Sequence, residues 1–169
     1  HQRKFLNESI TEFERNGFAL SKSDRDSLKV IKDQLAALSD QFSENIAAED
    51  DFLEVDADDM EGLPVDYKEA HEQAGGIYKI DLSYPSYGPF MKYSTSESAR
   101  KALFMKYQNR AAPENLEVLQ QLLEKRREMS NLLGYDSYSA YILADRMAQD
   151  PATVWEFEEN LKDDLREKT

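Results

Sequence analysis

An apolar stripe spaced at alternating intervals of three and four residues constrains the fold of this chain more than any other feature. The stripe runs through Leu28, Ile31, Leu35, Leu38 and Phe42. Because an α-helix turns once in about 3.6 residues, this spacing places all of these side chains on one narrow helical face. Ser21, followed by Asp24, has the pattern of an N-terminal capping box. We therefore expect one long helix over residues 21–48, packed against another helix as in a coiled coil.

Amphipathic patterns predict helices over most of the remaining chain. A short stripe ends at Asn16-Gly17, a good helix stop, and this helix should form an antiparallel pair with the long one; its apolar residues are Phe5, Leu6, Ile10 and Phe13. A helix is predicted over 113–133, with Pro113 at its first position and Gly134 directly after its last residue. Further helices are predicted over 96–110, over 137–147 and from Pro151 onward.

Evidence for strands is confined to one place. Apolar and polar residues alternate from Tyr78 to Tyr84, and residues 52–55 form a short possible partner. The two prolines in Tyr84–Phe90 predict a loop there, because each removes a backbone donor and disfavours helix in the residue before it. The expected fold class is therefore all-α, built of antiparallel helix pairs, with one minor two-stranded β ribbon near 52–55 and 77–83. Since no linker or repeat interrupts residues 1–169, a single helical region is expected.

The charge distribution excludes some partners. Most of the net charge of −13 comes from one segment, since residues 33–67 hold twelve acidic residues and no lysine or arginine. Nucleic acids and anionic membranes are therefore unexpected partners, since both attract basic stripes. No run of 18 apolar residues predicts a membrane-spanning helix. The absence of cysteine fits a reducing compartment, and we expect the protein in the cytoplasm.

Candidate metal ligands are few. A catalytic zinc site needs two or three converging imidazoles or carboxylates, commonly from two histidines on one helical face. The chain holds only His1, a terminal residue, and His71, which lacks a second histidine nearby and is expected at a solvated helix end. The acidic run from Asp50 to Glu61 suggests calcium, but it lacks the glycine and the final glutamate of an EF-hand loop. We expect no catalytic residue and no metal ligand in this chain, and its substrate-binding residues are unknown.

Arg126 is the one candidate for a structural buried charge. It interrupts the apolar stripe of the 113–133 helix, so its side chain should be at least partly buried and paired with a carboxylate. Substrate contact is the alternative. Tyr135, Tyr138 and Tyr141 are spaced by three residues, and their hydroxyls could line a peptide groove. Half-buried packing is the more common role of such rings.

Several sequence blocks occur in an order and at a spacing typical of one enzyme family. They are Arg15–Phe18, Phe42–Asn45, Gly62–Pro64, Tyr78–Lys92, Gln120–Leu123 and Arg126–Tyr135, and the stretch Leu122–Leu161 is the most informative part. Together they resemble the N-terminal helical region of the thimet oligopeptidase and neurolysin family of zinc metallopeptidases, which includes oligopeptidase A and peptidyl-dipeptidase Dcp-like enzymes. The resemblance covers nearly the whole chain. Because the chain starts without methionine and stops inside a predicted helix, we expect a fragment of such an enzyme.

The resemblance implies a mostly helical parent enzyme, about four times longer, that hydrolyses short peptides inside a deep channel. In that family a His-Glu-x-x-His helix and a downstream glutamate bind zinc, and this chain contains neither. We therefore expect no cofactor here, zinc in the parent, and inactivity of this chain alone. Its partners would be the remaining catalytic part and, through the parent, short peptides. Two alternatives stay open: a stand-alone acidic helical interaction module with a basic partner, and a calcium-binding helical domain.

Overall fold

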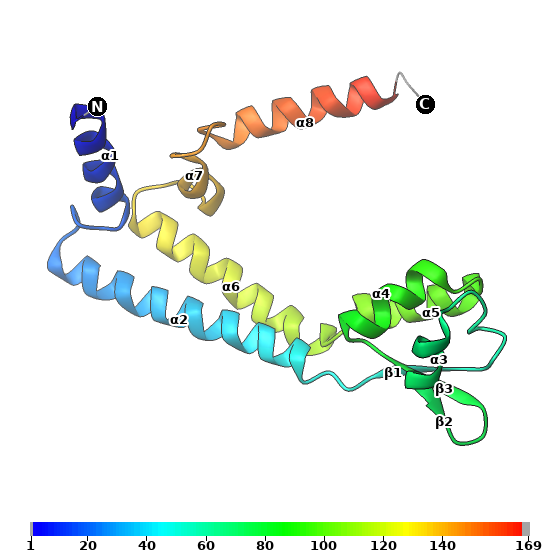
Figure 1. Cartoon of the computed structure of the whole chain (residues 1–169). Helices are drawn as coiled ribbons and strands as arrows, with labels where there is room; N and C mark the ends of the chain where they lie inside the picture. Colours follow the sequence, from blue (N-terminus) through cyan, green and yellow to red (C-terminus); the bar gives the residue numbers. More distant parts are fainter. Residues whose placement is uncertain (1, 167–169) are drawn as a thin grey trace. The chain divides into compact units, whose positions relative to one another are not determined.

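A computed structural model describes residues 2–166 and confirms the predicted fold class. The helices are α1 Gln2–Arg15, α2 Lys22–Ala47, α3 Val65–His71, α4 Tyr84–Tyr93, α5 Glu97–Gln108, α6 Ala112–Leu132, α7 Tyr138–Leu143 and α8 Pro151–Arg166. The strands are β1 Phe52–Val55, β2 Glu72–Gln73 and β3 Ile77–Asp81. The described part of the chain is thus mainly helical with one small sheet (Figure 1).

Contacts within the chain define two compact units. Unit 1 comprises the described residues of His1–Asp40 and Val118–Thr169, and unit 2 comprises Gln41–Glu117. Unit 1 therefore contains α1, α7 and α8 with the larger parts of α2 and α6. Unit 2 contains the sheet and the helices α3, α4 and α5.

The long predicted helix forms the core of unit 1, but its partner differs from the expected one. Leu28 and Ile31 of α2 are buried against Met129 of α6, and α2 and α6 run side by side in opposite directions (Figure 1). Partly buried residues complete this cluster: Leu20, Leu35, Leu132, Leu133, Tyr138 and Tyr141. No described residue of α1 belongs to it, so the predicted apolar pairing of α1 with α2 is wrong. Local periodicity shows that a helix has an apolar face but not which helix will cover it.

The predicted helix ends are largely confirmed. Ser21 Oγ accepts a hydrogen bond from the Asp24 N–H at 3.1 Å and donates to the Asp24 carboxylate at 2.8 Å, which is the expected cap of α2. The helix α6 starts one residue before Pro113 and ends two residues before Gly134, whose φ is +84°. Asp150 Oδ1 accepts from the Thr153 N–H at 2.9 Å and so caps α8. These ends depend on neighbouring residues alone, and for that reason they are readable from sequence.

The core of unit 2 is a three-stranded antiparallel sheet with helices packed against it. The strand order is β1-β3-β2, with Leu53 opposite Ile80 and Gln73 opposite Ile77. The central buried residues include Met60, Ile80, Phe90 and Leu103, all fully buried. The predicted ribbon of β1 and β3 is confirmed. The third strand, β2, was not predicted, because its two residues are both polar and show no alternation of apolar and polar side chains.

The helix α4 corrects the prediction of a loop over Tyr84–Phe90. Pro85 lies in the first turn, where a backbone N–H has no intrahelical partner to lose. Pro89 does remove one hydrogen bond inside the helix, and Gly88 before it adapts more readily than other residues. Burial outweighs this loss, because Phe90 is fully buried in the unit 2 core and Ser86 is also buried. Tertiary packing has therefore overridden the local signal.

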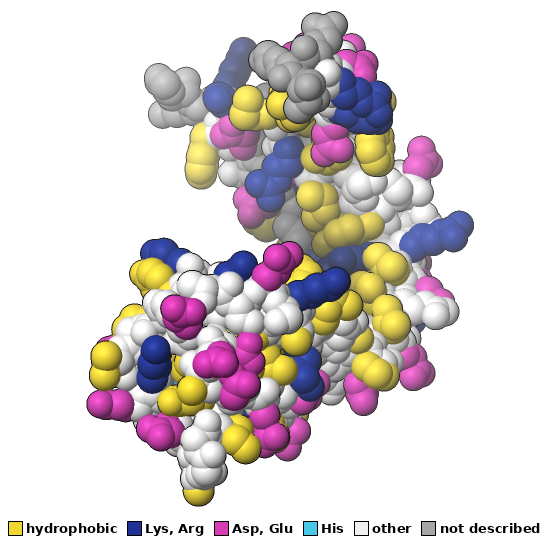
Figure 2. All heavy atoms as spheres, turned by 90° about the vertical axis from the view of Figure 1, so that its right-hand side faces the viewer, with side chains coloured by type: hydrophobic (Ala, Val, Ile, Leu, Met, Phe, Trp, Pro, Cys, Tyr) yellow, Lys and Arg dark blue, Asp and Glu magenta, His cyan; other side chains and the backbone are white. Residues whose placement is uncertain are grey.

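Charged and apolar side chains are mixed over the surface. On the face drawn in Figure 2, acidic side chains (magenta) are interspersed with basic ones (dark blue), and apolar side chains (yellow) also reach the surface. The basic side chains on this face are scattered and do not form a stripe. Among the described helices, none is both long enough and apolar enough to cross a membrane.

Candidate functional site

His71 is tied into unit 2 through both of its ring nitrogens. It ends α3, its ring stacks on Tyr67 with centroids 4.0 Å apart, and Nδ1 lies 2.7 Å from the Tyr67 carbonyl oxygen. Because that carbonyl can only accept, Nδ1 carries a proton, and in the neutral ring Nε2 then accepts from the Ser86 hydroxyl at 3.0 Å. The residue lies at a helix end, as predicted, but it is half-buried. His1 lies outside the described residues.

The groups around His71 are also satisfied within unit 2. The Tyr67 hydroxyl donates to the Ser86 carbonyl oxygen at 2.6 Å, and burial raises the pKa of Tyr67 strongly. Partial burial raises the pKa of Asp81, but hydrogen bonds from Ser83 and Ser86 outweigh it, so the pKa of this carboxyl is lowered overall. The arrangement holds α3, β3 and α4 together. Ser86 is buried, so its hydroxyl is not placed to attack a substrate.

The acidic run at 50–61 is used mainly in turns and ion pairs. Asp56 Oδ1 accepts from the backbone N–H groups of Asp58 and Asp59 at 2.9 and 3.1 Å, and Ser96 Oγ donates to Asp59 Oδ1 at 2.6 Å. Asp56 thereby organises its own turn, and Asp59 connects this turn to Ser96, the N-cap residue of α5. Within the part of the chain that the structure describes, no three histidine or carboxylate side chains come together as metal ligands. The residues present do not fit a zinc site.

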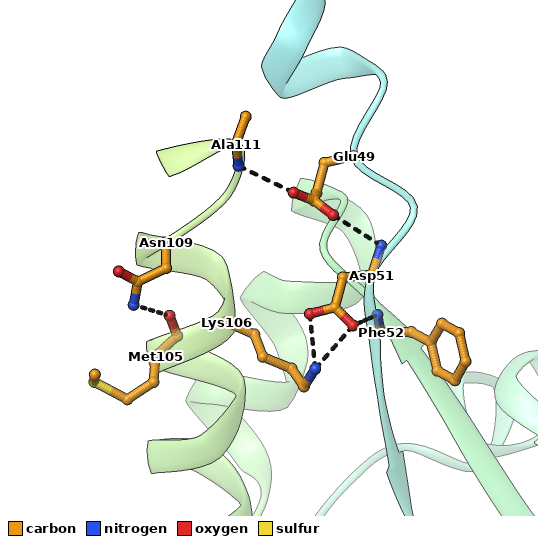
Figure 3. Close-up of polar contacts among 7 residues, drawn as sticks. All are labelled: Glu49, Asp51, Phe52, Met105, Lys106, Asn109 and Ala111. Carbon is orange, nitrogen blue, oxygen red and sulfur yellow. Dashed lines mark hydrogen bonds and ion pairs between the residues drawn. The ribbon is translucent and has the colours of Figure 1, made fainter. Parts of the chain in front are cut away.

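Two carboxylates tie the segment after α2 to α5 and the start of α6 (Figure 3). Glu49 accepts from the backbone N–H groups of Asp51 at 3.3 Å and Ala111 at 3.0 Å. Asp51 accepts two hydrogen bonds from Lys106 Nζ, at 2.7 and 2.8 Å, and one from the Phe52 N–H. Figure 3 shows the Glu49 carboxylate directed at the N–H groups of Ala111 and Asp51, and the Asp51 carboxylate directed at Lys106 and the Phe52 N–H. The hydrogen bond from Lys106 lowers the pKa of the Asp51 carboxyl.

The function of this network is to hold a strained connection. Ala111 has φ of +51°, a left-handed conformation that alanine rarely adopts, and its side chain is buried. The bond from its N–H to Glu49 satisfies a backbone donor at the junction of α5 and α6. Each carboxylate is bound to the chain through these hydrogen bonds, and we assign neither of them a role as an acid or base. The network is structural.

Arg15 is a largely buried cation that the sequence did not predict. Its side chain is only 13% exposed, and Nη2 donates to the Tyr141 carbonyl oxygen at 2.8 Å and lies 3.3 Å from Asp145 Oδ1. The guanidinium also lies 5.0 Å from the Tyr141 ring centroid, and its Nη1 is buried without a hydrogen-bond partner. The sequence contained little indication that Arg15 would be buried, because this residue lies next to a helix stop and on a mostly polar helical face.

An open cavity of ≈ 540 Å³ lies beside Arg15 in unit 1. Its lining combines one guanidinium with the carboxylates of Glu8, Glu12 and Asp145. Such a cavity can hold water or a polar group, but it contains no pair of a nucleophile and a base. We assign it no catalytic chemistry.

Arg126 is half-buried and lies over the ring of Tyr138, with Cζ 5.1 Å from the centroid. The ion pairs found among the described residues do not include the carboxylate partner predicted for it. A cation–π contact is the partner observed. Its assignment as a structural charge stays a prediction. Tyr135 and Tyr138 both pack against Tyr141, at centroid distances of 5.3 and 6.1 Å, so these tyrosines are half-buried.

Comparison with known proteins identifies the class of enzyme to which this helical chain is related. Residues 90–169 match peptidase family M3. The chain is 32% identical to saccharolysin of Saccharomyces cerevisiae, over 96% of this chain and 24% of that protein. It is 30% identical to a thimet-like oligopeptidase of Dictyostelium discoideum (95% and 24%) and 29% identical to oligopeptidase A of Haemophilus influenzae (95% and 26%).

The similarity is thus to peptidases, and it extends along nearly the whole chain. Residues 90–169 match peptidase family M3, and nearly the whole chain is similar to oligopeptidases of the thimet type. It spans about a quarter of the length of the curated relatives that it matches. The family resemblance predicted from the ordered sequence blocks is therefore confirmed.

Proposed function

We propose that residues 1–169 are the non-catalytic helical region of a longer zinc metallo-oligopeptidase that hydrolyses short peptides. One observation supports this above all: 96% of the chain aligns with only 24% of a peptidase. In this proposal the chain forms part of the wall of a channel that admits short, unfolded peptides. Units 1 and 2 are subdivisions of this one region.

The proposal assigns the metal to the remaining part of the enzyme. Zinc held by that part would act as a Lewis acid toward the peptide carbonyl and would make a water molecule a stronger nucleophile. The two histidines of this chain do not provide a ligand set, since His71 is engaged with Tyr67 and Ser86. This region contributes shape instead, through the packed α2 and α6 helices and the core of unit 2. Its partners are the catalytic remainder and, through it, the peptide substrate.

The test compares the 169-residue chain with the whole protein encoded by the same gene. Zinc content is measured by mass spectrometry, and cleavage is measured with a quenched fluorescent peptide of about ten residues. We expect about one zinc per whole protein and cleavage by it alone. Stoichiometric zinc and peptide cleavage by the purified 169-residue chain would overturn the proposal. So would a complete reading frame without a His-Glu-x-x-His sequence.

The second candidate is a stand-alone acidic interaction module, and the twelve acidic residues at 33–67 favour it. Such a module would bind a basic peptide with an affinity that falls steeply between about 0.05 and 0.5 M salt, because exposed charges are screened. A reading frame that ends near residue 169, together with such binding, would select it. We propose a cytoplasmic location, to be checked by fractionation, and no nucleic-acid or membrane partner.

A further inference from the structure

The helix α1 presents an apolar surface that is largely exposed in the described structure, although Phe13 contacts the exposed ring of Phe18 with centroids 5.0 Å apart. Four large apolar side chains of this helix are between 46% and 72% exposed: Phe5, Leu6, Ile10 and Phe13. At about 100° per residue, these four lie within one arc of the helix surface, with the uncharged Ser9 between them. No residue of α1 whose side chain is described is buried. We call Phe5, Leu6, Ile10 and Phe13 the α1 arc.

The rotation of α1 is set by its polar face. Asn7, Thr11 and Arg15, each four residues from the next, line the cavity that Tyr141 and Asp145 also line. Arg15 holds this orientation through its bonds to the Tyr141 carbonyl oxygen and the Asp145 carboxylate. The α1 arc therefore points away from the residues that α1 contacts. A surface helix of a complete globular protein shows the reverse arrangement, with its apolar face inward.

An uncovered helix of this kind is difficult to maintain in water. α1 has 14 residues, and isolated helices of that length are marginal even with good helix formers. Most helical stability in proteins comes from packing an apolar face, and the apolar face of α1 is mostly exposed, with Phe13 against the exposed ring of Phe18. Contiguous exposed apolar patches in soluble proteins mark sites where another surface binds.

We infer that the α1 arc is the docking surface for a part of the longer M3 peptidase polypeptide that lies outside this chain, and that this part presents an uncharged, apolar face to it. The inference rests on the proposed function and adds a surface to it. The relatives carry this region within polypeptides about four times its length, so covering sequence is available in the same molecule. No charged residue lies inside the arc, so an apolar occupant leaves no unpaired charge.

Cysteine accessibility tests the inference, because the chain contains no cysteine. Leu6→Cys places a thiol inside the α1 arc, and Thr11→Cys places a matched thiol on the opposite, polar face of the same helix. Both positions are exposed and neither is buried in a core, so both variants should fold. The rate of maleimide modification at each site is followed by peptide mass mapping, in the 169-residue chain and in the whole protein.

In the isolated chain we expect both thiols to react rapidly and at a rate independent of protein concentration. In the whole protein we expect the Leu6→Cys thiol to react at least tenfold more slowly, while the Thr11→Cys thiol changes less than threefold. If the whole protein cleaves peptides but its Leu6→Cys thiol reacts with maleimide as fast as in the isolated chain, the docking surface is refuted and the proposed function still holds. Slow modification of the Leu6→Cys thiol in the isolated chain also refutes the inference. If the rate is slow at all protein concentrations, another part of this chain covers the α1 arc. If it is slow only at high protein concentration, a second copy of the chain covers it. A reading frame without further sequence would refute both proposals.

Discussion

Gly62→Ala should destabilise unit 2 far more than Gly75→Ala, although the two glycines have nearly the same backbone conformation. Their φ angles are +87° and +90°. A Cβ on Gly75 would meet no atom within 4 Å, whereas a Cβ on Gly62 would overlap the Tyr93 carbonyl oxygen and lie 3.2 Å from Thr95 Cγ2. The pair therefore separates the cost of a positive φ from the cost of a steric clash with backbone.

The magnitudes follow from these contacts. Placing alanine at positive φ costs about 1–2 kcal/mol, and the reduced entropy of the unfolded chain offsets up to about 1 kcal/mol of that. Gly75→Ala should thus lose about 0–2 kcal/mol. Gly62→Ala must also displace the backbone near Tyr93, which costs about 1–3 kcal/mol, and it strains the hydrogen bond from the Thr95 N–H to the Glu61 carbonyl oxygen, worth about 1 kcal/mol. We expect a difference of about 2–4 kcal/mol between the variants.

The assay is urea unfolding followed by far-ultraviolet circular dichroism, with hydrogen exchange and peptide mapping to locate the loss within residues 41–117. Gly75→Ala is the matched control, and Gly76→Ala, with φ of +76° and an equally open Cβ position, is a second one. Equal losses for Gly62→Ala and Gly75→Ala would refute the reasoning, because the packing of Gly62 against Tyr93 would then contribute nothing.

Three further predictions concern the charged residues and the strained junction. Ala111→Gly should change the stability by less than about 1 kcal/mol, because the strain relieved at φ +51°, about 1–2 kcal/mol, is offset by the loss of a buried methyl group and by the larger entropy of the unfolded chain; a loss above about 2 kcal/mol in urea unfolding would contradict this. Since Lys106 lowers the folded-state pKa of Asp51, the pair stabilises the protein above the unfolded pKa of about 3.9, and the gain disappears as pH falls through the lower folded value. Lys106→Met should therefore lose more stability at pH 7 than at pH 2, and equal losses would count against the pairing. Arg126→Leu should lower the melting midpoint less than Arg126→Ala, since leucine refills the volume of the side chain over Tyr138, and the opposite order would reject its partial burial.

Features encoded by neighbouring residues were predictable from the sequence alone. The ends of α2, α6 and α8 depend on a cap or on glycine within one turn, and their predicted positions agree with the structure to within a few residues. The alternating pattern predicted β3, and the ordered blocks predicted the M3 family. The lack of a zinc-binding motif was equally readable, because such ligands must recur at short, fixed spacing.

The helix pairing, the helical state of α4 and the burial of Arg15 could be found only in the tertiary structure, because they depend on which surfaces pack together. Periodicity predicted apolar faces on both α1 and α2, but only the fold pairs α2 with α6 and leaves the α1 arc exposed. The prolines of α4 predicted a loop, and burial of Phe90 outweighs them. Arg126 stood out by interrupting a stripe, whereas Arg15 is largely buried as well, and its partners lie more than 120 residues away. A local preference, such as a helix cap, contributes about 1 kcal/mol to stability, whereas burying one large apolar side chain contributes about 1.5–3 kcal/mol.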